Sequence, residues 1–188
     1  DQAAEAVTRV SLHLERRQGV VLVCHDPGVA VDALAPAATE ALPGPVLLEV
    51  TGPWETRDEA GRDLALPAPG DWSHCPGWEL FTGTVLYSRR LTLTAGQAAQ
   101  AAFLDLGAVG DIASVRLNGE VLGVCAWAPY RLPTHRLLRA GENHLEVSVT
   151  NTRANAAYGR QLPSGLMGPV RLLAALAPLR GSGQRRPG

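Results

Sequence analysis

The chain has 188 residues, an apolar fraction of 46% and a formal net charge of −1. This length holds one full domain with a sizeable core, or one domain and part of another. Because 17 cationic residues balance 18 acidic ones, the composition argues against a nucleic-acid partner and against an anionic membrane. The three cysteines, Cys24, Cys75 and Cys125, lie far apart, so they indicate neither a disulfide framework nor a zinc site.

The first 42 residues predict a β-hairpin followed by an Ala-rich segment. Residues 7–14 alternate apolar and polar side chains, which is typical of a half-buried strand, and residues 20–24 form a short apolar run. The sequence RQG at 17–19 indicates a turn, so these two runs are expected to pair. Residues 30–42 are either a loose helix or a loop, and Pro-Gly-Pro at 43–45 ends this part of the chain.

After residue 45 the sequence is dominated by short strand-like segments with turn residues between them. The strands are expected at residues 46–50, 84–93, 101–106, 114–117, 121–124, 131–133, 144–151 and 169–175. Asn118-Gly119 stands between two of them and predicts a type I′ hairpin turn. No amphipathic helix is expected here. Many short strands separated by Gly and Pro predict an all-β sandwich or barrel.

Seven short motifs follow one another between residues 83 and 170. They are GTVLYSRRL at 83–91, LDLG at 104–107, ASVRLNGEVLG at 113–123, PYRLP at 129–133, LRAGENHL at 138–145, VTN at 149–151 and GLMGPV at 165–170. Each motif is weak alone. The ordered set resembles the sugar-binding β-sandwich of family 2 glycoside hydrolases, the β-galactosidase and β-glucuronidase group.

Two further motifs are more similar to α-L-rhamnosidase-like enzymes, which carry such a sandwich near their C-terminus. TGPW at 51–54 resembles the start of that module, and LPSGLMGPV at 162–170 resembles its end. The resemblance implies an all-β, galactose-binding-like jelly-roll β-sandwich over residues 46–178. It also implies that residues 1–42 are the tail of an upstream domain. The composition of the last residues, GSGQRRPG at 181–188, predicts that 179–188 form a disordered tail.

By the same resemblance, the chain is a non-catalytic carbohydrate-binding or accessory domain of a glycoside hydrolase with an α-L-rhamnosidase or β-galactosidase-like parent, acting in carbohydrate metabolism. Its expected partners are a saccharide and the parent's catalytic domain. Glycoside hydrolysis needs two carboxylates facing one another across the scissile bond. The acidic residues here are dispersed over turns, and none lies in a motif that resembles the family's acid or nucleophile.

Other kinds of site find little support in the sequence. His74 and Cys75 are neighbours, but adjacent side chains on an extended chain point to opposite faces. The five histidines lack metal-ligand spacing, and no glycine-rich loop is suited to hold a phosphate. We therefore predict no catalytic residue, no metal and no other cofactor, and we do not expect the chain to act as an enzyme on its own.

Saccharide binding needs an aromatic ring that stacks on the apolar side of a sugar, with planar hydrogen-bonding groups nearby. Two clusters have these residue types. One is formed by Trp72, Trp78 and Phe81, and the other combines Trp127 and Tyr130 with the loop at 151–161. In the family resemblance the second loop lies toward the catalytic domain. The predicted sugar-binding residues are Trp127, Tyr130, Arg153, Asn155, Tyr158 and Arg160.

Other interpretations remain open. Trp54 and Trp72 are better explained as core or edge-covering residues. Trp127 and the 151–161 loop fit packing against a partner domain as well as they fit sugar contact. The chain would then be a structural interaction domain that braces the catalytic domain without binding sugar. A self-sufficient hydrolase is the third and weakest alternative.

Overall fold

The computed structural model describes residues 42–66 and 68–176. The predicted hairpin at residues 7–24, the Ala-rich segment as far as residue 41 and the predicted C-terminal tail lie outside the described residues.

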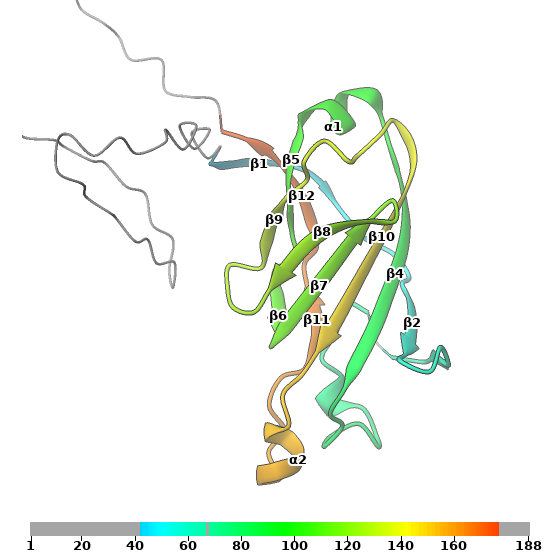
Figure 1. Ribbon diagram of the computed structural model, residues 1–188, viewed down its shortest axis with the longest axis vertical. Helices are drawn as coiled ribbons and strands as arrows, with labels where there is room; N and C mark the ends of the chain where they lie inside the picture. Colours follow the sequence, from blue (N-terminus) through cyan, green and yellow to red (C-terminus); the bar gives the residue numbers. More distant parts are fainter. Residues whose placement is uncertain (1–41, 67, 177–188) are drawn as a thin grey trace, which may run out of the picture.

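Two antiparallel sheets form a sandwich-like arrangement (Figure 1). The larger sheet has six strands in the order β3 (Asp63–Leu64), β2 (Glu55–Asp58), β4 (Thr84–Leu93), β10 (Gly141–Thr150), β7 (Ile112–Leu117) and β8 (Glu120–Cys125). The smaller sheet has four strands in the order β1 (Pro43–Glu49), β12 (Arg171–Ala175), β5 (Ala101–Asp105) and β9 (Arg131–Pro133). A two-stranded sheet pairs β11 (Gly165–Gly168) with β6 (Ala108–Gly110).

The expected strands agree closely with those observed. The bounds of β4 and β9 are as predicted, and β10 begins three residues before the expected start at 144. Asn118 and Gly119 both have positive φ, 55° and 86°, as a type I′ turn requires. The sequence did not indicate β2, β3, β6 and β11, which have four residues or fewer and are therefore too short for a clear alternation of apolar side chains.

Two short helices interrupt the strands, although no amphipathic helix was expected. They are α1 (Ala95–Gln100) and α2 (Ala154–Tyr158), with six and five residues. The first begins with a capping box, in which the Thr94 hydroxyl accepts from Gln97 N (3.2 Å) and the Gln97 side chain accepts from Thr94 N (3.0 Å). No helix in the described ranges is long and apolar enough to cross a membrane.

The core lies between the two sheets, and the pairing of β4 with β10 supplies much of it. Their register is continuous from Gly141 opposite Leu93 to Thr150 opposite Thr84. Alternate side chains therefore point inward, and the buried hydrophobic set on these strands is Val85, Tyr87, Leu91, Leu93, Leu145, Val147 and Val149. Trp54 and Trp72 are also buried, which confirms that these two aromatic residues are part of the core.

A buried amide holds the start of β10. Asn143 is fully buried, and its Oδ1 accepts hydrogen bonds from Asn118 Nδ2 (2.9 Å) and Arg139 N (3.0 Å). Its Nδ2 donates to Arg139 O (2.7 Å) and Gly141 O (3.0 Å). Asn118 Oδ1 in turn accepts from His144 N (2.9 Å). These bonds join the β7–β8 turn to the loop before β10 and so help to set the register of the central strands.

We expect Asn143→Ala to lower the free energy of unfolding by about 2–4 kcal/mol, because hydrogen-bonding groups of Asn118 and Arg139 lose their buried partner. Urea denaturation followed by circular dichroism measures this loss. The matched control is Glu142→Ala, which removes only an exposed ion pair with Arg90 (2.9 Å) and is expected to cost about 0.5 kcal/mol or less. An equal loss in the two variants would contradict the role of the buried amide.

Candidate functional site

The two chain segments that carry the predicted sugar-binding residues meet at Asp111. One is the β8–β9 loop with Trp127 and Tyr130, and the other is the connection between β10 and β11, which contains α2. Asp111 lies between β6 and β7 with φ of 75°. Its backbone oxygen accepts a hydrogen bond from the Tyr130 hydroxyl (2.6 Å), and its Oδ2 accepts from Thr152 N (2.5 Å). Residues distant in sequence are thereby brought to one residue, through its backbone oxygen and its carboxylate.

Four of the six predicted residues are exposed on these segments. The side chains of Trp127 and Tyr158 are 66% and 75% exposed, which is unusual for large aromatic residues in a sandwich with a well-formed core. Arg153 and Arg160 are exposed as well, and their guanidinium groups form no hydrogen bond or ion pair with other described residues. The loop that carries α2 projects from one end of the sandwich (Figure 1).

The other two predicted residues are buried. Tyr130 is almost fully covered, and its hydroxyl is engaged with Asp111. Asn155 is buried within α2, where its Nδ2 donates to Leu162 O (3.0 Å) and Ser164 Oγ (3.3 Å) and its Oδ1 accepts from Leu162 N (3.0 Å). Both side chains direct polar atoms toward the protein, so they hold the loops that present their exposed neighbours.

The loop that contains Asp71 is hydrogen-bonded to the segment that follows α2. Asp71 Oδ1 accepts hydrogen bonds from Ser73 N and from Ser164 N, both at 2.9 Å. Trp72 N donates to Ser164 O (2.9 Å), and Gly70 N donates to Leu166 O (2.7 Å). The segment around residue 71 therefore runs beside the segment that follows α2 and anchors it.

The aromatic cluster in this loop belongs to the interior. Trp72 is fully buried and packs edge-on against Phe81, with ring centroids 5.8 Å apart, while Trp78 and Phe81 lie 4.4 Å apart. Trp78 and Phe81 are partly buried and pack against the core. Of the two clusters that the sequence offered, only the one with Trp127 and Tyr158 presents widely exposed rings.

The anchoring role of Asp71 predicts a pH dependence. Burial alone would raise the pKa of its carboxyl, but hydrogen bonds from Ser164 and Ser73 outweigh burial and hold that pKa below its ordinary value. A carboxyl with a depressed folded-state pKa contributes stability that is complete above its unfolded pKa of about 3.9 and is lost as the pH falls through and below that value.

We therefore expect the wild-type free energy of unfolding to fall between about pH 5 and pH 3, and we expect this fall to be smaller in Asp71→Asn, which cannot ionise. Urea denaturation at a series of pH values measures the difference. Asp63→Asn is the matched control, because the Asp63 side chain is 83% exposed and its ion pair with Arg57 is at the surface. If Asp71→Asn and Asp63→Asn show the same pH profile, Asp71 does not anchor the loop through its charge.

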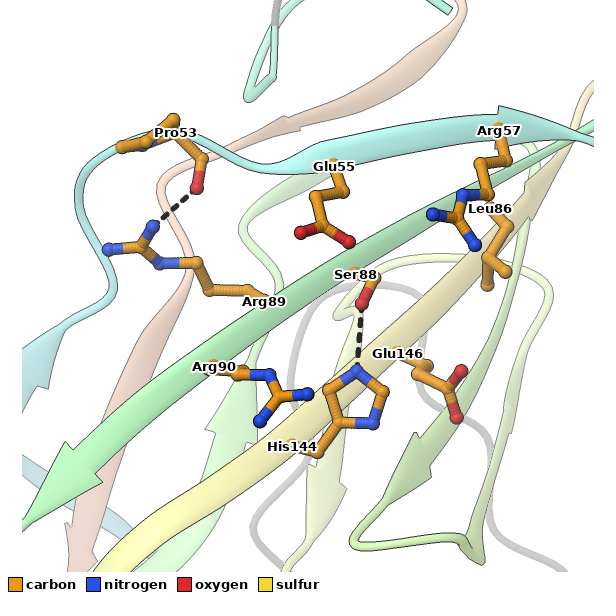
Figure 2. A pocket seen from close by; sticks show the side chains of 9 residues that line it. All are labelled: Pro53, Glu55, Arg57, Leu86, Ser88, Arg89, Arg90, His144 and Glu146. Atoms are coloured by element: carbon orange, nitrogen blue, oxygen red, sulfur yellow. Dashed lines mark hydrogen bonds between the residues drawn. The ribbon is translucent and has the colours of Figure 1, made fainter. Parts of the chain in front are cut away.

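A pocket that sequence reasoning missed lies on the outer face of the six-stranded sheet (Figure 2). Its volume is about 430 Å³, and its lining side chains come mainly from β2, β4 and β10: Pro53, Glu55, Arg57, Leu86, Ser88, Arg89, Arg90, His144 and Glu146. At its centre the Ser88 hydroxyl and His144 Nε2 share a hydrogen bond of 2.8 Å. The only local signal in the sequence was the polar character of alternate residues on β4 and β10, because the pocket combines strands far apart in the chain.

No metal centre is evident in the described ranges 42–66 and 68–176, where no group of three or more His, Cys, Asp or Glu side chains is arranged to hold an ion. The two candidate surfaces differ in the chemical groups that they offer to a ligand. We call the surface formed by the β8–β9 loop and by the connection between β10 and β11 the loop end. It offers the exposed rings of Trp127 and Tyr158 and the guanidinium groups of Arg153 and Arg160. The outer face of the six-stranded sheet instead offers a pocket with paired hydrogen-bond donors and acceptors.

Comparison with known proteins finds similarity to parts of glycoside hydrolases. No family model matches the chain. The structure is similar to a rhamnosidase from Novosphingobium sp. PP1Y, with a TM-score of 0.57 and 34% identity, covering 69% of this chain and 15% of that one. A protein of Formosa agariphila, provisionally named a β-glucuronidase, is 31% identical over 130 residues, which are 64% of this chain and 11% of the relative.

A β-glucuronidase from Lactobacillus rhamnosus shares the fold, with a TM-score of 0.54 at 20% identity, covering 68% of this chain and 28% of that one. The chain thus spans a small part of each of these relatives. Its sequence and structure are similar to a portion of glycoside hydrolases.

Proposed function

We propose that this chain is a non-catalytic carbohydrate-binding or accessory domain of a glycoside hydrolase, with an α-L-rhamnosidase or β-galactosidase-like parent. The observation that carries the proposal is the match to the rhamnosidase, at 34% identity over 69% of this chain but only 15% of that protein. A likeness confined to so small a part of an enzyme favours a module over a catalytic unit. Within this proposal, the sandwich is a galactose-binding-like jelly roll.

The saccharide site of this proposal is the loop end. Trp127 and Tyr158 would supply stacking faces, since an exposed aromatic ring can cover the apolar side of a sugar and lose contact with water. Arg153 and Arg160 would donate hydrogen bonds to hydroxyl groups from planar guanidinium forks. Tyr130 and Asn155 complete the set as residues that position the two loops, and their effect on binding would be indirect.

A second candidate function is a structural domain that braces the catalytic domain without binding sugar. Val121 and Val124 on β8 are 63% and 62% exposed, and Trp127 follows them in the adjoining loop. Exposed apolar side chains that follow one another along an edge strand and its loop are typical of a surface covered by another domain. In this interpretation Trp127 would pack against the parent's catalytic domain.

Calorimetric titration of the chain with saccharides that contain rhamnose, galactose or glucuronate separates these functions. We expect saturable binding that is weakened about tenfold by Trp127→Ala or Tyr158→Ala, because one stacked ring contributes about 1–2 kcal/mol. Trp127→Phe is the matched control and should retain most of the affinity, since a ring remains.

Urea denaturation checks the stability of each variant. The free energy of unfolding should change by about 0.5 kcal/mol or less, because these positions are exposed. Absence of binding at millimolar saccharide, or binding that the two alanine variants leave unchanged, would reject the loop site. Absence of binding would favour the bracing function.

A further inference from the structure

We propose that the pocket on the outer face of the six-stranded sheet is a second binding site, suited to a neutral, polyhydroxylated ligand such as a short uncharged saccharide. It shares no residue with the loop end and does not depend on binding there. The inference rests on the arrangement of charges around the pocket, on the unused hydrogen-bonding groups at its centre and on the rigidity of the strands that carry them.

Two carboxylates stand on opposite sides of the pocket floor. Glu55 on β2 and Glu146 on β10 are both register partners of Ser88 on β4. Since neighbouring strands are about 4.8 Å apart, the backbone positions of the two glutamates are separated by about 10 Å. Neither glutamate forms an ion pair or hydrogen bond through its side chain with another described residue. Both therefore offer free acceptors to a ligand that lies over Ser88.

Donors are placed at the rim and are already oriented. The Arg57 Nε contacts Asp63 (2.8 Å) and the Arg90 NH1 contacts Glu142 (2.9 Å), so each guanidinium is held by one bond and keeps other N–H groups for a ligand. Figure 2 shows the Arg90 side chain directed toward His144 from one side of the pocket, with Arg57 on the other. Orientation before binding reduces the entropy that a ligand must offset.

The centre of the pocket can adapt to a hydroxyl group. In the bond between Ser88 and His144 either side chain can be the donor, depending on the imidazole tautomer. A sugar hydroxyl is likewise both donor and acceptor. The pair can therefore bind a hydroxyl group that acts as either hydrogen-bond donor or acceptor. A site for one ion of fixed charge does not require this adaptability.

The charge balance argues for a neutral ligand. Of the charged side chains that line the pocket and are free to face a ligand, Arg57 and Arg90 are matched in number by Glu55 and Glu146. Arg89 is turned aside, because its guanidinium donates to the backbone oxygens of Thr51 and Pro53. With no net charge to attract an ion, closely spaced donors and acceptors favour a ligand rich in hydroxyl groups.

The strands that carry the central residues of the pocket are held in a fixed register, which suits a preformed binding site. Ser88, His144 and Glu146 lie on the two central strands, whose ten-residue register is continuous. Leu86 adds an apolar side chain to the floor, but no Trp, Tyr or Phe side chain lines the pocket. Without a stacking ring we expect weak, millimolar affinity for a single sugar.

Titration of isotope-labelled protein with D-galactose, L-rhamnose, D-glucuronate and D-glucosamine, followed by amide chemical shifts, tests the proposal. We expect saturable shifts at residues 86–90 and 144–146 with the two neutral sugars, and weaker effects with the two charged ones. Stronger binding of glucosamine or glucuronate than of both neutral sugars, or no shift at these residues, would overturn it.

Variants connect the shifts to the pocket. Glu55→Ala and Glu146→Ala should each weaken the neutral-sugar titration about fivefold or more, because each removes a charged acceptor. Glu120→Ala is the matched control on β8 of the same sheet and should have no effect. Trp127→Ala should also leave the shifts at 86–90 and 144–146 unchanged. The loop end and this pocket are therefore tested at different residues, and either can fail without the other. Equal weakening by Glu120→Ala and Glu146→Ala would count against the pocket.

Discussion

The antiparallel pairing of β4 with β10 is the constraint on which the core and the sheet-face pocket both depend. Side chains alternate along a strand, so one register places Tyr87 and Val147 inside and Ser88 and Glu146 outside. A slip of one residue would reverse every side chain on the moving strand. The buried amide of Asn143 at the beginning of β10 therefore affects a surface that it does not touch, because it helps to hold the strand in register.

The loop end is built on a different principle. Its exposed rings lie outside the two sheets, with Trp127 in the β8–β9 loop and Tyr158 at the end of α2, and two aspartates connect the loops to the sandwich. Asp111 accepts hydrogen bonds from Tyr130 in the β8–β9 loop and from Thr152 before α2. Asp71 accepts one from Ser164, which follows α2. Charged acceptors that receive backbone N–H groups are strong hydrogen-bond partners, so a long connection can keep one conformation at the surface.

The sequence allowed much of the fold to be predicted, since long alternating strands and the Asn118-Gly119 turn carry local signals. The helix α1 was missed although Thr94 and Gln97 form a capping box, because six residues give too little periodicity. For the loop end, sequence identified the exposed Trp127 and Tyr158 but could not distinguish them from Tyr130, whose burial depends on its contact with Asp111. The sheet-face pocket could not be predicted, because its members become neighbours only through strand order.

The edges of the six-stranded sheet have a consequence for the behaviour of the chain in solution. One edge strand, β3, has two residues, and the other, β8, is interrupted by a register shift opposite Val115 and Arg116. An edge this short or kinked offers few consecutive backbone groups to a strand from another molecule. The short β3 and the register shift in β8 therefore limit edge-to-edge pairing of this sheet with a strand from another molecule.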